Sequence, residues 1–371
     1  MYNIRDCGVT AFIFIIHQQL YYSVRKSISY MEYIFQGIYY GNDNLRISIA
    51  TVSRVLNGSE NVRPSTRKKV MDVIDKYDYT PNAFARGMGL HSLKTIGILC
   101  ADSSDLFLAK AVYFLEQELQ ANGYESLLCC TGYNPDIKKN YLNLILSKKV
   151  DSIILVGSHF IGSTEDENQY IKDVSTQVPI MLLNASFDHP NVYSTLCDDY
   201  GTMFEAATEM IQSGITDILY LYDSKSYSGL KKLHGFCDAM KEHNIPGFEK
   251  LIHFYDGNIE HLNEVADFVA RIATKGTSFH GIMTSDDSLA IGSIKYAQKK
   301  GIRIPEELSV MGYNNSMLTN CCTPELTSVD NRLETQTHQL VQTLLGVLAG
   351  EEMPKKSIFS GKIIKRGTTL F

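Results

Sequence analysis

The sequence predicts a small all-α head followed by an α/β body of two doubly wound lobes, each built on a parallel sheet. Two amphipathic helical patterns, at residues 48–57 and 64–77, predict the head. Apolar runs of strand length alternate with helical patterns from Thr95 onward, and strands buried on both faces are typical of parallel sheets. The net charge also changes sign between the head and the body. Residues 46–94 hold nine Lys and Arg against four Asp and Glu, a net +5, and residues 1–45 are neutral, so the total of −6 leaves −11 for residues 95–371.

The first helical pattern has one apolar side and one polar side. Ser48 can accept a hydrogen bond from the first turn, and Asn57 with Gly58 ends the helix. The apolar side holds Val52, Val55 and Leu56. The other side holds Ile49, Ala50, Ser53 and Arg54. Small and hydroxyl groups around one guanidinium suit base edges and phosphate oxygens, although an ordinary surface helix has the same pattern.

The second helical pattern begins near Pro64, whose fixed φ suits a first helical position. Its apolar stripe is Val70, Val73, Ile74 and Tyr77, and its outer face carries Arg67, Lys68 and Lys69. Pro81 then breaks the helix, and residues 82–88 form a short, weakly helical piece. A basic head on an acidic body is typical of a phosphate-binding module attached to a soluble sensor, and a solvated basic face is the alternative.

The body alternates strands and helices over about 275 residues. This length exceeds what a single hydrophobic core usually supports, so we expect two lobes with a cleft between them. Expected strands are 95–101, 126–131, 152–156, 217–222, 252–255, 281–285 and 308–313. Expected helices include 107–122, 140–147, 199–213 and 289–300.

Two motifs in the head resemble those of a known family. Ser48 to Asn57 matches the run S-x-x-T-V-S-R-x-L-N of lactose/galactose-repressor type regulators, and Tyr79-x-Pro81-Asn82-x-x-Ala85-Arg86-x-Met88 matches their hinge helix. The resemblance implies a helix-turn-helix DNA-binding domain over 47–80, incomplete here, a hinge helix and linker over 81–94, and a periplasmic-binding-protein-like body over 95–371. It also implies DNA contacts by Ser48, Ile49, Ala50, Thr51, Ser53, Arg54, Asn57, Asn82, Arg86 and Met88. Met88 stands where Leu is usual as the minor-groove wedge.

The resemblance continues along the body through Asp199-Tyr200-Gly201, Ser285-Asp286-Asp287, Gly312-Tyr-Asn-Asn315 and Arg366-Gly-Thr368. It implies effector contacts by Phe107, Asn184, Lys232, Asp286 and Asn314. Three of these depart from the common pattern, because Lys232 replaces Arg, Asp286 replaces Asn and Asn314 replaces Asp. The hydrogen-bond fork to a sugar hydroxyl pair is therefore rearranged. A helix cap or turn role is the alternative for each polar residue.

The resemblance also implies three crossings between lobes, which we expect near Leu196, near 313–319 and near 327–331. The first lobe would then comprise about 95–195 and 314–328. The second would comprise about 196–313 and 329–371.

Residues 1–46 match nothing in the family, whose members place another helix directly before the Ser48 run. The apolar run Ala11 to Ile16 is far shorter than the roughly 20 residues of a membrane span. The segment also lacks the basic start and cleavage site of a signal peptide. We hypothesise a misassigned start, a frameshift or an insertion. If the segment is genuine, the head lacks its packing partner and DNA binding is impaired or lost.

The sequence argues against an enzyme and against a cofactor or metal. Asp286 and Asp287 are adjacent at a helix start, where they point apart and Asp is commonly a cap. No P-loop, H-E-x-x-H or G-x-S-x-G occurs, and the eight Cys show no C-x-x-C spacing, so reduced thiols in a cytoplasmic protein are the plainest account.

Two functions follow as expectations. The first is a homodimeric transcription regulator, a repressor or an activator with repression favoured, that binds a pseudo-palindromic operator in double-stranded DNA and responds to a sugar or sugar phosphate. The alternative is a sugar-binding protein that has lost DNA binding because its head is incomplete. Neither involves a membrane.

Overall fold

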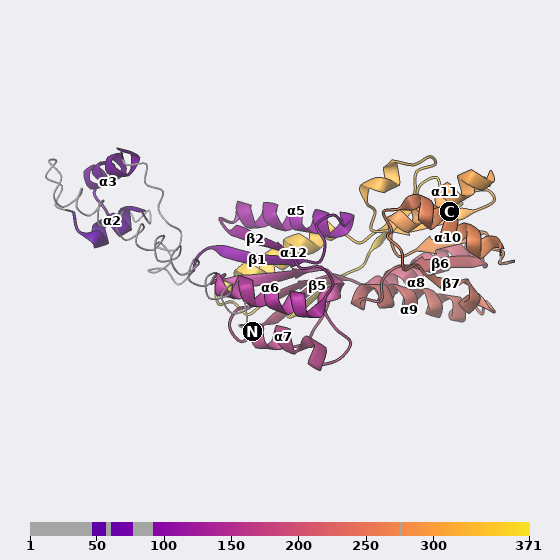
Figure 1. Ribbon diagram of the computed structural model, residues 1–371, viewed down its shortest axis with the longest axis horizontal. Coiled ribbons are helices and arrows are strands. Elements are labelled where there is room, and N and C mark those ends of the chain that lie inside the picture. The colour runs from indigo at the N-terminus through magenta and orange to yellow at the C-terminus, as the bar shows by residue number, and fades with distance from the viewer. Residues whose placement is uncertain (1–46, 57–60, 77–91, 275) are drawn as a thin grey trace, which may run out of the picture. The chain divides into compact units, whose positions relative to one another are not determined.

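The computed structural model describes residues 47–56, 61–76, 92–274 and 276–371 (Figure 1). The chain divides between Leu93 and Lys94 into two units, the head and the body. Residues 1–46 lie outside the described ranges. So do four of the residues with expected DNA contacts: Asn57, Asn82, Arg86 and Met88. Within the described ranges no helix is long and apolar enough to cross a bilayer.

The head contains α2 (Ile49–Leu56) and α3 (Pro64–Lys76). The backbone N–H of Thr51 donates to Ser48 Oγ over 3.3 Å, which confirms Ser48 as the residue that caps α2. Helix α3 begins at Pro64, as its fixed φ predicts. The buried core consists of Val55, Val62 and Val70, and half-buried Ile47, Val52 and Ile74 pack around it.

The first lobe of the body is a six-stranded sheet in the order β11-β5-β4-β3-β1-β2. Its strands are β1 (Thr95–Cys100), β2 (Glu125–Cys130), β3 (Ser152–Val156), β4 (Ile180–Leu183), β5 (Val192–Cys197) and β11 (Lys356–Phe359), all parallel. Helices α5 (Leu106–Ala121) and α12 (Leu333–Leu348) share one buried cluster with the sheet. Helices α6 (Pro135–Ser147) and α7 (Gln169–Ser175) share another, so each face of the sheet is covered (Figure 1).

The second lobe is a six-stranded sheet in the order β12-β10-β9-β8-β6-β7. Its strands are β6 (Ile218–Tyr222), β7 (Ile252–Phe254), β8 (Gly281–Thr284), β9 (Ser309–Tyr313), β10 (Thr327–Asp330) and β12 (Lys362–Ile364). Only β12 runs antiparallel to its neighbour within this sheet. Helices α8 (Asp199–Gln212) and α9 (Tyr227–Glu242) pack in one buried cluster, and α10 (Leu262–Thr274) and α11 (Asp287–Lys300) in another (Figure 1). Short 3₁₀ turns are η1 (Ser158–Phe160), η2 (Asp166–Asn168), η3 (Phe248–Leu251) and η4 (Met317–Asn320).

The lobe boundaries expected from the sequence are wrong in two segments. Strand β10 pairs with β9, so residues 314–330 belong to the second lobe. Helix α12 packs on the first lobe and β11 pairs with β5, so residues 333–359 belong to the first. The chain therefore crosses at Asp198, at 331–332 and at 360–361, and not at 313–319. The last crossing was missed because β11 is a short edge strand with alternating exposure, which gives no apolar run.

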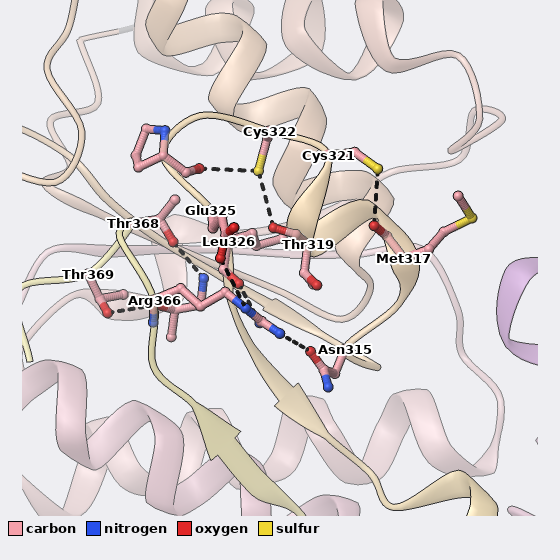
Figure 2. Close-up of polar contacts among 12 residues, drawn as sticks. Asn315, Met317, Thr319, Cys321, Cys322, Glu325, Leu326, Arg366, Thr368 and Thr369 are labelled. Carbon is pink, nitrogen blue, oxygen red and sulfur yellow. Dashed lines mark hydrogen bonds and ion pairs between the residues drawn. The ribbon is translucent and has the colours of Figure 1, made fainter.

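The C-terminal segment holds the loop that follows β9 through hydrogen bonds (Figure 2). The Arg366 guanidinium donates to Asn315 Oδ1 and to the carbonyl of Leu326, each over 2.8 Å. Thr368 Oγ accepts from the backbone N–H of Thr327 and donates to the carbonyl of Val310. The loop between β9 and β10 is thus held at both ends by a segment more than 35 residues later in the chain.

We expect Arg366→Lys to lower the free energy of unfolding by about 1–2 kcal/mol, because an ammonium cannot reproduce the two directed bonds of the guanidinium. Urea unfolding of the full chain measures the change. Lys365→Ala, which removes an exposed ion pair to Glu209, is the matched control and should change stability by less than about 0.5 kcal/mol. Equal losses in the two variants would contradict the fastening role of Arg366.

Candidate functional site

Side chains of both lobes meet at a cavity of about 80 Å³ beyond the carboxyl ends of the strands. The first lobe contributes residues that follow β1, β3 and β4, and the second lobe contributes residues that follow β6, β8 and β9. The cavity adjoins a wider opening of about 680 Å³, which shares Asp105, His159, Asp223 and Asp286 with it. The carboxyl edge of a parallel sheet is where open α/β folds bind ligands.

All five residues expected to contact an effector line this cavity: Phe107, Asn184, Lys232, Asp286 and Asn314. Phe107 lies in the first turn of α5 and is half-buried. Asn184 follows β4 in the left-handed region, with φ 63°. Its side chain is 9% exposed. The structure thus brings the five together, and their contact with a ligand stays a prediction.

Asp286 and Asn314, two of the residues that depart from the family pattern, bind each other. Asn314 Nδ2 donates to Asp286 Oδ2 over 2.9 Å, and Asn314 Oδ1 accepts from Asn331 Nδ2 over 3.0 Å. The other carboxylate oxygen of Asp286 accepts the N–H of Ser288 and caps α11. In the common pattern the amide and the carboxylate occupy the opposite positions, so the exchange preserves the pair. It also moves the negative charge from the end of β9 to the start of α11.

Lys232 lies in the floor of the cavity. Its Nζ donates to the carbonyl of Ser285 over 3.0 Å and lies 3.9 Å from the centre of the Tyr313 ring. The Tyr313 hydroxyl in turn donates to the buried carboxylate of Asp199 over 2.7 Å. Burial raises the pKa of Asp199, and the nearby Lys232 ammonium partly opposes that rise. The ammonium therefore compensates a buried carboxylate beneath the cavity as well as lining it.

Sequence reasoning missed several residues of the site. Asp105 caps α5 through the N–H of Leu108, and Asp223 Oδ1 accepts from Ser285 Oγ over 2.7 Å. Ser158 of the first lobe and Ser226 of the second hydrogen-bond through their hydroxyl oxygens, 2.8 Å apart, so the lobes touch beside the cavity. These residues follow β1, β3 and β6, which were predicted as strands, and polar residues directly after such strands were the signal that could have found them.

Carboxylates dominate the electrostatics of the cavity. Burial, together with the smaller effects of the Asp286 and Asp223 carboxylates, raises the pKa of Asp105 to about 6 against the bonds from its own helix. Burial, followed by the charge of Asp223, also raises the pKa of Asp286. His159 stays neutral near pH 7, because burial and then Lys138 lower its pKa to about 4. Charges from the two lobes thus repel each other across the cleft.

The raised pKa of Asp105 predicts a pH-dependent stability. The ordinary value is 3.8 and the folded value about 6, so the folded state keeps the proton longer than the unfolded state does. The free energy of unfolding therefore falls as the pH rises from about 4 to 6, and this loss is fully present above 6. Asp105→Asn keeps a capping oxygen and removes the charge, so at pH 7.5 it should stabilise the protein by roughly 1–2 kcal/mol.

Urea unfolding at pH 4.5 and 7.5 measures this difference, which should be several-fold smaller at the lower pH. Asp173→Asn, at an exposed position of α7, should have no such pH-dependent effect. An unchanged or lower stability of Asp105→Asn at pH 7.5 would show that the charge carries no penalty.

The head presents basic side chains on its exposed surface. Arg54 of α2 is exposed, as are Arg63, Lys68 and Lys69 beside or on α3. Thr51 is half-buried, and its hydroxyl oxygen lies 2.9 Å from Ser48 Oγ. The side chains of Ile49, Ala50 and Ser53 lie outside the described part of the structure. Exposed cations on or beside short helices are groups that contact phosphate oxygens in protein–DNA complexes.

Other chemistry has no assembled site in the described ranges. The seven described cysteines are free. No group of three or more His, Cys, Asp or Glu side chains is placed there to hold a metal ion. Asp287, the neighbour of Asp286, is buried and accepts hydrogen bonds from the Ser328 hydroxyl and the Ser316 N–H. Its carboxylate therefore points away from that of Asp286, which lines the cavity.

Two family models match the chain. The model of bacterial regulatory proteins of the lacI family matches residues 46–82, and the model of the periplasmic binding protein-like domain matches residues 207–369. Among solved structures, the transcriptional repressor AscG of Escherichia coli has a TM-score of 0.65 at 25% identity, over 75% of this chain and 99% of that one. The lac repressor dimer has a TM-score of 0.78 at 19% identity, over 88% and 96%, a likeness of fold.

Curated relatives match over most of the chain. An HTH-type transcriptional regulator of Lachnoclostridium phytofermentans is 48% identical over 334 residues, which are 90% of this chain and 99% of that protein. The catabolite control protein A of Priestia megaterium is 32% identical over 76% of this chain and 83% of that protein. The chain therefore belongs to the lacI family of bacterial regulatory proteins, and it is a transcriptional regulator with a DNA-binding head and a ligand-responsive body.

Proposed function

We propose that the protein is a homodimeric repressor that binds a pseudo-palindromic operator through its head and responds to a small hydroxylated ligand in the cleft. One observation carries this proposal: polar side chains from both lobes line a single cavity, and the lobes touch beside it through Ser158 and Ser226. A ligand held by both lobes changes the equilibrium between their arrangements by its differential affinity for them.

Relatives support both halves of the proposal. One solved relative in fold is the regulator CelR in complex with cellobiose, at 20% identity. Another is the lac repressor dimer bound to its operator. A single short helix buries little surface on DNA, so two heads on a symmetric site are needed for useful affinity. We place this chain in the cytoplasm, where its operator lies, and propose no catalytic activity.

The surface of the first lobe offers apolar area for a second copy of the chain. Leu127 and Leu128 of the edge strand β2 are 38% and 43% exposed, and Tyr113 of α5 is 51% exposed. Large apolar side chains that gather on neighbouring elements are typical of subunit contacts. We propose that this edge of the lobe, formed by β2 and α5, contributes to the dimer, which sedimentation of the full chain would measure.

Fluorescence anisotropy with a palindromic operator library at two salt concentrations tests the proposal. Binding should weaken steeply as salt rises, because each neutralised phosphate releases counterions. A cleft ligand should change the affinity for the operator. A protein that binds the cleft ligand, but binds no DNA or binds it without salt dependence, would instead be a sugar-binding protein whose incomplete head has lost its function.

Arg54→Ala should weaken specific binding to the operator by roughly 1–3 kcal/mol, because Arg54 is exposed on the helix that we propose enters the major groove. The measurement is anisotropy with the selected operator and with a scrambled duplex. Arg303→Ala, which removes an exposed cation from the body, is the matched control and should leave the affinity unchanged. Unchanged affinity in Arg54→Ala would remove this residue from the interface.

A further inference from the structure

The charged residues that line the cavity and its wider opening are almost all acidic. The cavity and its wider opening are lined by five carboxylates and one ammonium, together with the neutral His159. The carboxylates are those of Asp102, Asp105, Asp223, Glu260 and Asp286, and the ammonium is that of Lys232. These carboxylates would repel an anionic ligand such as a sugar phosphate. Such repulsion strongly opposes binding in a partly buried site, where solvent screens the charges poorly.

Lys232 does little to offset this field inside the cavity. Its ammonium donates to a backbone carbonyl, lies against the Tyr313 ring and compensates the buried Asp199 below. Asp105 and Asp223 face the cavity from opposite lobes. The charge of Asp223, after burial and the charge of Asp286, also raises the pKa of Asp105. Within the described residues Asp223 takes a single hydrogen bond, on Oδ1, so its other carboxylate oxygen can receive a donor from a ligand.

A second, independent feature of the cavity also calls for a ligand. Asn184 lines the cavity with only 9% of its surface exposed, and its side-chain amide has no hydrogen-bond partner within the described part of the chain. A buried amide without partners costs free energy unless a ligand or water supplies them. The hydroxyls of Ser158, Ser224 and Ser226 line the same space. These groups match a ligand with several hydroxyls.

We propose that the ligand of this cleft is a hydroxylated compound that carries a protonated amine and no phosphate, an amino sugar or amino polyol, with its ammonium between Asp105 of the first lobe and Asp223 of the second. This inference rests on the proposed function of the cleft and narrows the class of effector. An ammonium between the two carboxylates would relieve their repulsion and draw the lobes together, whereas a neutral hydroxyl in that place would relieve only part of it.

A pair of closely related probes tests the charge. Tris(hydroxymethyl)aminomethane and pentaerythritol differ by one ammonium in place of one hydroxymethyl group. Both are titrated into the full-length protein in HEPES at pH 7 and matched ionic strength, by calorimetry and by thermal shift. The same comparison is made with the gluco, galacto and manno series of hexosamine, hexose and hexose 6-phosphate.

The ammonium member of each bound pair should bind about tenfold tighter, because hydrogen bonds to charged groups are roughly twice as strong as neutral ones. The phosphates should not bind. Asp223→Asn, which keeps an acceptor for Ser285, should abolish the preference, and Asp267→Asn, exposed on α10, should retain it. The inference is overturned if the two members of the Tris pair behave alike, bound or unbound, if a phosphate binds more tightly, or if Asp223→Asn keeps the preference.

Operator anisotropy separates this inference from the function on which it rests. An amine that binds the cleft without changing operator affinity would uphold the charge preference and contradict effector control. A neutral sugar or a sugar phosphate that alone changes operator affinity would uphold effector control and overturn the preference for an amine.

Discussion

Lys232→Met should lower the free energy of unfolding by about 3 kcal/mol and weaken ligand binding by disturbing the floor of the cavity, because it removes one member of a buried set of charges. Met keeps most of the side-chain volume. Its introduction leaves the carbonyl of Ser285 without its donor and the carboxylate of Asp199 without the nearby ammonium. Chemical unfolding and titration with the ligand of the cleft measure the two effects.

The loss in Lys232→Met should depend on pH in a defined direction. Without the ammonium the pKa of Asp199 rises further, so the folded state takes up a proton that the unfolded state releases at lower pH. The stability deficit should therefore shrink as the pH falls toward 5 and grow toward 8. Lys231→Met, at the exposed neighbour on α9, should cost less than about 0.5 kcal/mol. Lys232→Arg should restore stability, and a deficit that is constant over this pH range would exclude Asp199 as the partner.

Gly235→Ala should destabilise the body by roughly 3 kcal/mol, through a clash between two backbones. A Cβ at residue 235 of α9 would lie 2.3 Å from the carbonyl oxygen of Tyr200 in α8. Two helices must then separate, since no flexible side chain can yield. The first turn of α8 carries Asp199 and the first turns of α9 carry Ser228 and Lys232, so the same shift disturbs the floor of the cleft.

Gly346→Ala is the matched control, because Gly346 also lies within a helix. Its added Cβ would meet the thioether of Met353, the end of a flexible side chain that can move aside. The gain in helix propensity, about 1 kcal/mol, should roughly offset that adjustment. Thermal unfolding of both variants measures the contrast. Similar melting temperatures for the two would show that the α8–α9 contact tolerates separation.

Much of the fold could be predicted because buried strands and helices have a clear hydrophobic pattern in the sequence. The strands β1, β3, β8 and β9 are continuous apolar runs, and the structure buries nearly every residue in them. Edge strands have a weaker hydrophobic pattern. Strand β2 is largely exposed although its sequence is apolar, and β11 and β12 are short and carry lysines. The misassigned lobe segments follow from this, since pairing across 160 residues leaves no local pattern.

The candidate site was partly predictable for a related reason. Lys232, Asp286 and Asn314 came from family motifs, and the structure places them around one cavity. Asp105 and Asp223 have no such motif, and their importance depends on the approach of two lobes, which a linear sequence does not display. The direct bond between Asp286 and Asn314 likewise needed coordinates, although the paired departure from the family pattern pointed to it.

Because the chain passes between the lobes three times, two successive strands late in the chain, β11 and β12, complete different sheets. Strand β11 closes one edge of the first sheet beside β5, and β12 closes an edge of the second beside β10. Neither lobe can reach its final form on the ribosome until residues 356–364 have emerged. A nascent chain that stops before residue 356 would therefore leave an unpaired sheet edge in each lobe, and such edges favour aggregation and recognition by quality-control proteases.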